Sequence, residues 1–193
     1  MSLPFRIIKI FEGILMNKSI RYTVTSAVIA ALYAGLTVIS NMLGLAYSGL
    51  QFRISEALAV LPVFTPAAIS GLAVGCFISN IGSFNPIDMI FGTLATLCAA
   101  FLSYYSRNVR IKDIPIISFF SPVIFNALVV GAEISLFLSE GGITLAGFTV
   151  SALSVGAGEL AVMLALGLPL FFAVKHNNML TELFNSLELN KVK

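Results

Sequence analysis

The sequence predicts an all-α protein embedded in a membrane, and its composition carries the prediction. Of its 193 residues, 58% are hydrophobic and only 10% are charged, whereas a soluble domain carries roughly a quarter charged residues. The mean hydropathy is +0.99, and apolar runs reach about 20 residues, the length that a helix needs to cross a bilayer. Because so little charge could not keep a monomer dissolved in water, we expect lipid around the helices.

Four stretches are long and apolar enough to cross a bilayer as single helices. They cover about 20–43, 86–105, 114–138 and 148–174. A fifth apolar segment, 52–81, is too long for one ordinary span and short for two. Pro62 and Pro66 interrupt it, so its number of crossings has to be decided by another property of the chain.

The basic residues decide that number. All but one of the 11 Lys and Arg residues fall in three regions. Arg6, Lys9, Lys18 and Arg21 lie before or at the very start of the first span, Arg107, Arg110 and Lys112 lie in one loop, and Lys175, Lys191 and Lys193 follow the last span. The positive-inside rule places all three regions in the cytoplasm. An even number of crossings must then separate the first region from the second, and a five-span arrangement breaks this rule.

Segment 52–81 must therefore contribute two crossings or a re-entrant hairpin, but not one crossing. Two short helices, about 52–61 and 66–81, satisfy this condition. A cytoplasmic turn at PVFTP would join them, where prolines suit a turn and a first helical position. The prediction is a six-helix membrane bundle with both termini in the cytoplasm. The outer loops would be 44–51, 82–85 and 139–147, which contain no Lys or Arg.

Three parts of the chain are expected. Residues 1–19 resemble an amphipathic helix on the cytoplasmic membrane surface, with Arg6 and Lys9 on one face and Phe5 and Ile8 on another; a partly ordered tail is the alternative. No cleavage site of a signal peptide follows. Residues 20–175 form the membrane domain, and 176–193 form a cytoplasmic tail.

Little in the sequence points to catalysis. Cys76 and Cys98 lie in apolar runs and are interpreted as small buried residues rather than a disulfide or metal site. The single histidine, His176, lies near the C-terminal end. No phosphate-binding loop of the kind that ATPases use is present. We therefore expect a protein that is not an enzyme, with no metal or cofactor.

Five charged residues fall within the predicted spans, and the topology places all of them in the outer half of the bundle. They are Arg53, Glu56, Asp88, Glu133 and Glu159. A charge at mid-membrane costs at least ~3 kcal/mol, so it normally faces a partner or a water-filled cavity. These residues predict a binding cavity that opens outward, to which Asn80, Asn85 and Asn126 could add hydrogen bonds.

Structural roles compete with binding for three of these residues. Arg53 and Glu56 are spaced to form a local salt bridge, and Glu56 would also favour the positive end of its helix. Asp88 follows Asn85 and Pro86 in a pattern typical of a helix cap. Glu133 and Glu159 have neither a local cation nor a capping role, so they are the leading candidates for substrate binding.

Small residues line one side of the first span. Ala27, Ala31 and Ala34 recur with helical spacing, and Ala30 and Gly35 lie beside them. Small residues let helix backbones approach each other closely in lipid. This face either packs inside the bundle or docks another membrane protein.

The chain also resembles a known family. The stretch QFRISEALAVLPVFTPAAISGLAVGCFISNI, followed by NPIDMIFGTLATLCAAFLS, is similar to the QueT family. QueT proteins are substrate-binding S components of energy-coupling factor (ECF) transporters. The resemblance covers about 22–174.

The resemblance implies a six-helix importer subunit in the bacterial plasma membrane. It would bind a queuosine precursor base from outside and work with a membrane T component and two cytoplasmic ATPase subunits. Ala27, Ala30, Ala31 and Ala34 match the family's coupling face, and the three outer loops would gate the pocket. No nucleic acid is expected as a partner.

The sequence fits such a cargo independently. A 7-aminomethyl-7-deazaguanine base presents two adjacent donors and a cationic aminomethyl group, and carboxylates bind both. Glu133 and Glu159 are expected to contact the base, Arg53 to hold Glu56 or meet the ring carbonyl, and Phe52, Phe84 or Tyr47 to stack on the ring.

Three alternatives remain. An S component for another vitamin-like cargo would share the same fold. A self-sufficient secondary carrier would show inverted repeats and acids spread across the membrane, and neither is evident. A membrane enzyme would need a catalytic constellation that the spans lack.

Overall fold

The computed structural model describes residues 17–45, 52–81, 86–138 and 144–187. Within these ranges the chain is helical, apart from short turns and one isolated bridge between Ile111 and Ile114. In chain order the elements are α2 (Lys18–Met42), the 3-10 helix η1 (Ile54–Val63), α3 (Ala67–Ile81), α4 (Pro86–Ser106), α5 (Ile116–Glu133), the π-helical turn η2 (Ile134–Leu138), α6 (Leu145–Val162), the π-helical turn η3 (Met163–Gly167), α7 (Leu168–His176) and α8 (Asn178–Asn185).

The all-α prediction is confirmed, and so are the four long apolar stretches. Four helices are long and apolar enough to cross a membrane: Lys18–Met42, Pro86–Ser106, Ile116–Phe137 and Leu145–His176. Two apolar helices between the first and second of these, Ile54–Val63 and Ala67–Ile81, are shorter. The number of membrane crossings, which we expect to be six, and the cytoplasmic placement of both termini stay predictions.

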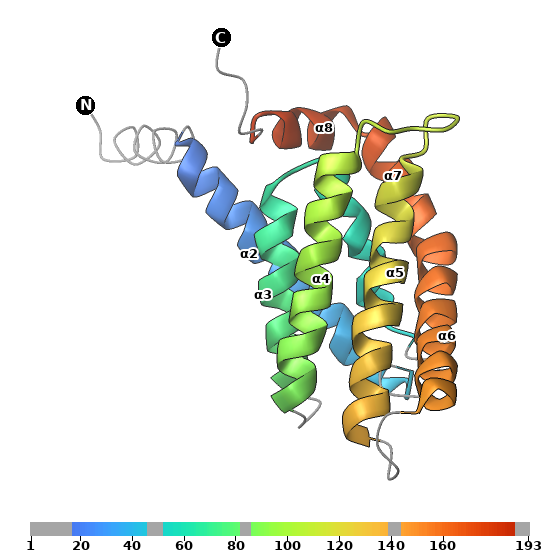
Figure 1. Ribbon diagram of the computed structural model, residues 1–193. Helices are drawn as coiled ribbons and strands as arrows, with labels where there is room; N and C mark the ends of the chain where they lie inside the picture. Colours follow the sequence, from blue (N-terminus) through green and yellow to red (C-terminus); the bar gives the residue numbers. More distant parts are fainter. Residues whose placement is uncertain (1–16, 46–51, 82–85, 139–143, 188–193) are drawn as a thin grey trace, which may run out of the picture.

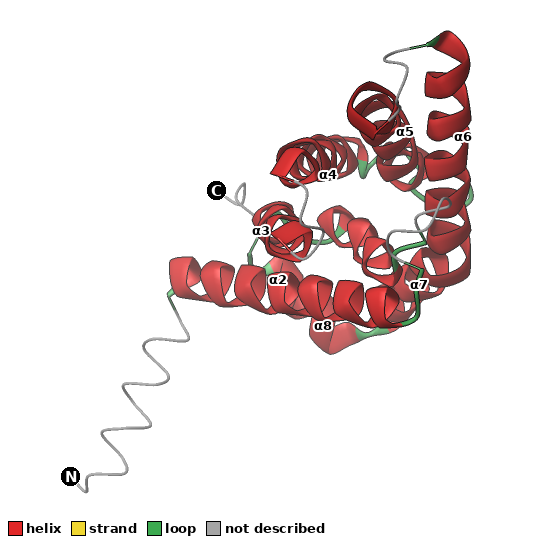
Figure 2. Ribbon diagram, turned by 90° about the horizontal axis from the view of Figure 1, so that it is seen from below, coloured by secondary structure: helices red, strands yellow, loops and turns green. Residues whose placement is uncertain are grey.

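The first of the short helices, η1, lies at the centre of the bundle. Every residue from Ser55 to Val63 is buried, and the helix touches α2, α3, α4, α5, α6, α7 and η3 (Figure 2). A 3-10 helix has weaker hydrogen-bond geometry than an α-helix, and irregular backbone is tolerated at membrane depth where protein surrounds it. The sequence predicted a helix at about 52–61 but not that it forms the core of the molecule.

The turn between η1 and α3 lies at the same end of the molecule as the basic loop. Val63 and Phe64, at the end of η1, line a cavity together with Arg107 and Lys175. The start of α2 reaches the same turn, because Tyr22 donates a hydrogen bond to the Pro66 carbonyl at 3.2 Å. Figure 1 shows α8 and the α4–α5 loop at this end as well. We call it the basic end.

Two glycines bring α3 against α2. A Cβ atom added at Gly71 would lie 2.8 Å from the Cβ of Ile29, and one added at Gly75 would lie 2.8 Å from the Cβ of Tyr33. Only glycine fits such contacts without moving a helix, and close backbone approach is how helices associate in lipid.

Serine side chains join α4 to α5 around a proline. Pro122 has no N–H to donate to the carbonyl four residues earlier, which is that of Ser118. The Ser103 hydroxyl donates to this carbonyl at 3.0 Å, and the Ser118 hydroxyl donates to the Ser103 carbonyl at 2.8 Å. The freed backbone group is therefore satisfied across the helix interface, as the membrane interior requires.

The end of the described chain adds a helix to the predicted tail. α8 follows α7 directly, and Asn177 caps it by accepting from the Leu180 N–H at 3.1 Å. Phe184 and Leu187 bury their side chains against the bundle. The predicted amphipathic segment at 1–19 lies almost wholly outside the described residues, and the division into three parts stays a prediction.

Candidate functional site

The five charged residues that the sequence singled out are all buried, with exposed fractions between 2% and 7%. They come from four elements: Arg53 and Glu56 from the start of η1, Asp88 from the first turn of α4, Glu133 from the last turn of α5, and Glu159 from α6. The start of η1 is the end farther from the basic end, so the charges gather toward the opposite side of the bundle.

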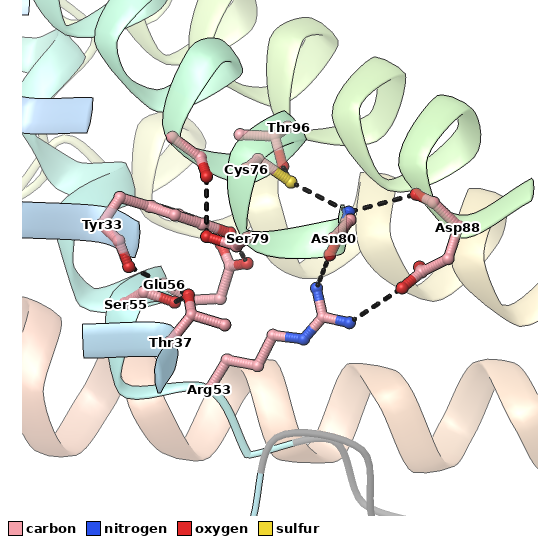
Figure 3. A network of polar contacts seen from close by, with 11 residues as sticks. Tyr33, Thr37, Arg53, Ser55, Glu56, Cys76, Ser79, Asn80, Asp88 and Thr96 are labelled. Carbon is pink, nitrogen blue, oxygen red and sulfur yellow. Dashed lines mark hydrogen bonds and ion pairs between the residues drawn. The ribbon is translucent and has the colours of Figure 1, made fainter. Parts of the chain in front are cut away.

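Arg53 is held by groups from α3 and α4. Its Nη2 lies 3.4 Å from Oδ2 of Asp88, and its Nη1 donates to Oδ1 of Asn80 at 3.2 Å (Figure 3). The sequence had suggested Glu56 as its partner. Arg53 instead pairs with Asp88, which is 35 residues away in the sequence, and only the packing of the helices brings the two side chains together.

Asn80 connects the same two helices. Its Nδ2 donates to the Asp88 carbonyl at 3.1 Å and approaches the Cys76 sulfur at 3.5 Å. A Cβ atom at position 92 would lie 2.8 Å from this Nδ2, so Gly92 leaves the room that the amide occupies. Asn80 is 0% exposed, and its contacts fix the guanidinium of Arg53 relative to α4.

Glu56 accepts a hydrogen bond from the Tyr33 hydroxyl on α2. Nearby, the Thr37 hydroxyl donates to Oγ of Ser55 at 2.7 Å. A buried carboxylate is stable only with hydrogen-bond partners, and Tyr33, itself 0% exposed, supplies one. These contacts tie the first turn of η1 to α2, on the side away from Asp88 (Figure 3).

A small cavity lies among these groups. Its lining includes Arg53, Glu56, Asn126 and Glu159, together with the smaller side chains Cys76, Gly92, Thr96, Val130 and Val155. The room for water in it is about 10 Å³, enough for one water molecule. A ligand of nucleobase size would therefore require the lining side chains to move apart.

Glu159 is the carboxylate best placed to meet a ligand in this cavity. Asn126 is a hydrogen-bond partner of its side chain, while its Oε1 is buried without a partner among the described residues. A buried oxygen without a partner costs stability. A ligand that donates a hydrogen bond there would remove that cost.

Glu133 lies beside this cavity rather than on its wall. Its side chain is 2% exposed and interacts electrostatically with Asp88 and Arg53. The π-helical turn η2 begins at the next residue, and η3 begins four residues after Glu159. Such turns are rare and frequent at functional sites.

The predicted site residues thus divide into three groups. Arg53, Glu56, Asn126 and Glu159 line one cavity, whereas Asp88 and Glu133 interact with Arg53 but do not line the cavity. Asn85, Phe84 and Tyr47 lie outside the described residues. Tyr33 and Thr96 were not predicted as site residues from the sequence, because a single hydroxyl inside an apolar span does not indicate a role until its hydrogen-bond partner is known.

The alanine face of α2 is only partly open. Ala27 and Ala31 are exposed and Ala34 is half-buried, but Ala30 is 6% exposed. A Cβ atom at Gly75 would lie 3.1 Å from its Cα. Ala30 therefore packs against α3, and the coupling role of the four alanines stays a prediction.

Four long apolar helices around a buried group of charges define a membrane protein with a polar site inside its helix bundle. The family model described as the QueT transporter matches residues 23–176. The chain belongs to the QueT transporter family, and the resemblance noted in the sequence is confirmed.

One relative is the protein named queuosine precursor transporter QueT from Lactococcus lactis subsp. cremoris (strain MG1363). The two chains are 43% identical over 83 residues, which make up 42% of this chain and 49% of the relative. The aligned part thus spans about half of the relative's length. No solved structure matches the chain.

Proposed function

We propose that this protein is the substrate-binding subunit of an ECF-type importer and captures a queuosine precursor base of the 7-aminomethyl-7-deazaguanine class from outside the cell. The observation that carries the proposal is the buried cavity lined by Glu56, Glu159 and Arg53. Membership of the QueT transporter family and the name of the Lactococcus relative support the cargo class.

The chemistry of the cavity suits this cargo. The base carries a lactam N–H next to an exocyclic amine, and one carboxylate can accept both. Its aminomethyl group is cationic and would interact favourably with a second carboxylate. Glu159 lines the cavity and has an oxygen without a partner, so we assign it the first role. Glu133, close to the cavity, would take the ammonium group.

Arg53 has a positioning role in this proposal. Asp88 and Asn80 fix its guanidinium group. One cation is thereby kept among the carboxylates, while Glu159 remains available to bind the ligand. The positive charge lowers the cost of gathering several acids in a low-dielectric bundle. Asp88 thus supports the cavity, rather than contacting the base.

Calorimetry on the purified chain, without partner subunits, tests the binding role. Wild type is expected to bind the deazaguanine base, and Glu159→Gln to weaken binding at least about tenfold, because a charged hydrogen bond contributes about 1.5–3 kcal/mol. Glu133→Gln should weaken binding less. Asp113→Asn is the matched control, since Asp113 is an exposed acid at the basic end, and should bind as wild type does.

The outcomes separate the alternatives. If wild type does not bind the base, the cargo assignment is wrong, and binding of a different vitamin-like molecule would identify the replacement. Equal binding by Glu159→Gln and wild type would contradict the assigned role of Glu159. Uptake by the isolated protein in liposomes, with no ATPase present, would instead establish a self-sufficient carrier.

The importer role also requires partners. We propose a multi-pass protein of the bacterial plasma membrane, with six crossings and both termini in the cytoplasm. A membrane T component would dock on Ala27 and Ala31 of α2, with Ala34 at the margin, and two ATPase subunits would drive release of the base inward. α2 suits such a surface because it is the least buried of the four long helices.

A further inference from the structure

An apolar groove lies between α2, η1, α7 and α8 and measures about 430 Å³. Among the described residues that line it, Arg21 is the only charged one and Thr25 the only uncharged polar one. No described residue lines both this groove and the cavity at Glu159. The apolar walls include Val28 and Leu32 of α2, Leu58 of η1, Leu170 of α7 and Leu183 of α8.

The groove extends along α2 over about the depth of one bilayer leaflet. Its lining on α2 runs from Ile20 to Leu32, a distance of about 18 Å at the rise of an α-helix. The hydrocarbon core of a bilayer is about 30 Å thick, so each leaflet contributes about 15 Å. Because the start of α2 lies at the basic end, the groove leads from that end toward the middle of the membrane.

The size of the groove suits a hydrocarbon chain. A water molecule takes up about 30 Å³ of liquid, and a methylene group is of similar size, so about a dozen methylene groups would fit. The α2 wall is open to such a chain, because Val24, Val28 and Leu32 are 53%, 53% and 51% exposed. An acyl chain in the groove would cover these side chains.

Arg21 places a cation where the groove meets the basic end. Its side chain is half-buried, and among the described residues no acid lies within ion-pair distance of its guanidinium. The positive-inside rule accounts for a cation at this level, but not for an apolar groove that leads away from it. A molecule with an anionic head and an apolar chain would match both features.

A protein would match the groove less well. A helix is about 10 Å across with its side chains, so only side chains of a partner helix could enter, and one of them would have to be an acid to pair with Arg21. A second copy, related by a two-fold axis along the membrane normal, would bring two Arg21 side chains to the same depth, where like charges repel. A lipid meets neither difficulty.

We propose that this groove binds an anionic phospholipid, with one acyl chain along α2 and the phosphate at Arg21. Arg is suited to bidentate contact with phosphate oxygens. α8 lies across this end of the molecule (Figure 1), and its residues Leu183 and Phe184 line the groove, so α8 would hold the chain close to its head. The site is additional to the transport role and does not depend on which base is carried.

The test uses the full chain purified in detergent and mixed with equal amounts of phosphatidylglycerol and phosphatidylcholine of the same chain length. Native mass spectrometry measures how much of each lipid stays bound. Wild type should retain phosphatidylglycerol in preference to phosphatidylcholine. Equal retention of the two lipids would show that the anionic head is not recognised and would overturn the proposal.

Substitutions at Arg21 test the head of the site. Arg21→Gln should weaken retention of phosphatidylglycerol about fivefold, the effect of one basic residue near anionic lipid, whereas Arg21→Lys keeps the charge and should retain the preference. Arg110→Gln is the matched control, because Arg110 is an exposed arginine at the same end that does not line the groove. Equal losses with Arg110→Gln and Arg21→Gln, or with Arg21→Lys and Arg21→Gln, would contradict a headgroup site at Arg21.

Filling the groove tests the chain of the site. Val28→Trp should lower retention of phosphatidylglycerol to that of phosphatidylcholine, whereas Val150→Trp, the same change at an exposed position of α6 outside the groove, should leave it unchanged. A dimer that Val28→Trp dissociates, or a co-purified T component that Val28→Trp removes without changing lipid retention, would assign the groove to a protein instead. Binding of the deazaguanine base is a separate measurement, so failure of either proposal leaves the other standing.

Discussion

Arg53 shows how a charge is tolerated inside this bundle. It lies at the start of η1 with 6% of its surface exposed, and its guanidinium contacts Asp88 and Asn80. An isolated charge at this depth would be costly, whereas a paired and hydrogen-bonded one is stable. Arg53 therefore fixes η1 relative to α3 and α4, and the cavity that it lines is held in shape by the same contacts.

Removing either member of this pair should destabilise the protein, and the two losses should not be additive. Arg53→Gln leaves Asp88 buried without its cation, and Asp88→Asn leaves the guanidinium without its anion, each costing about 3 kcal/mol or more. The double variant should lose less than the sum of the two. Thermal unfolding of the purified variants in detergent measures the three changes, and additive losses would show that the pair does not couple.

Sequence reasoning found the charged residues but not their partners. Burial could be inferred for Arg53 because it lies in an apolar run away from the three basic clusters. Its pairing with Asp88, 35 residues away, depends on how α3 packs on α4. The bond between Tyr33 and Glu56 likewise depends on where α2 crosses η1, and no local spacing contains that information.

At the scale of elements, the segment 52–81 shows which features of the helices near the site can be predicted from the sequence. Its prolines correctly placed the turn near PVFTP, since η1 ends at Val63 and α3 begins at Ala67. The sequence did not distinguish an α-helix from the observed 3-10 helix, because both present the same apolar residues over ten positions. Burial on all sides, rather than periodicity, decides that conformation.

The contact between α2 and α3 gives a matched test of packing. Gly75→Ala would place a Cβ atom 2.8 Å from the Tyr33 Cβ and 2.9 Å from the Ala30 carbonyl oxygen. We expect it to destabilise the protein by about 1–3 kcal/mol and to weaken base binding, because Tyr33 would move away from Glu56.

Gly35→Ala is the control on the exposed side of α2. Nothing lies within 4 Å of a Cβ atom at that position, so the change should be neutral or stabilise the helix by about 1 kcal/mol. Thermal unfolding and calorimetry of both variants provide the comparison. Similar behaviour of the two glycine variants would mean that α2 does not pack on α3 as described.

At the scale of the whole molecule, the two polar cavities lie at opposite ends of η1. One is lined by residues from its start, Arg53 and Glu56, and the other by residues from its end, Val63 and Phe64. The distribution of Lys and Arg predicted this asymmetry, because the basic loop and the basic C-terminal region share one side. The orientation of the molecule in the membrane stays a prediction that labelling can test.

Single cysteines introduced at two exposed apolar positions would report the orientation. Val109 lies in the α4–α5 loop and is 53% exposed, and Leu145 is the first residue of α6 and is 82% exposed. Cys98 is exposed, which corrects the expectation that it is buried, so the test uses a Cys98→Ala background. In that background, Leu145→Cys should react with a membrane-impermeant maleimide in intact cells, and Val109→Cys only after permeabilisation. The reverse pattern would mean that the charged cavity faces inward.

The last prediction concerns assembly with partners. Ala31 lies on the exposed side of α2, where a larger side chain touches nothing within the protein but would hold a partner helix away. Ala31→Leu should therefore abolish co-purification with the T component and uptake in cells, while calorimetry shows base binding unchanged. Ala161→Leu, an equally enlarged exposed position on α6, should assemble normally. Uptake that persists with Ala31→Leu would remove α2 as the docking face, and equal loss with Ala161→Leu would mean that any bulk in the lipid-facing surface disturbs assembly.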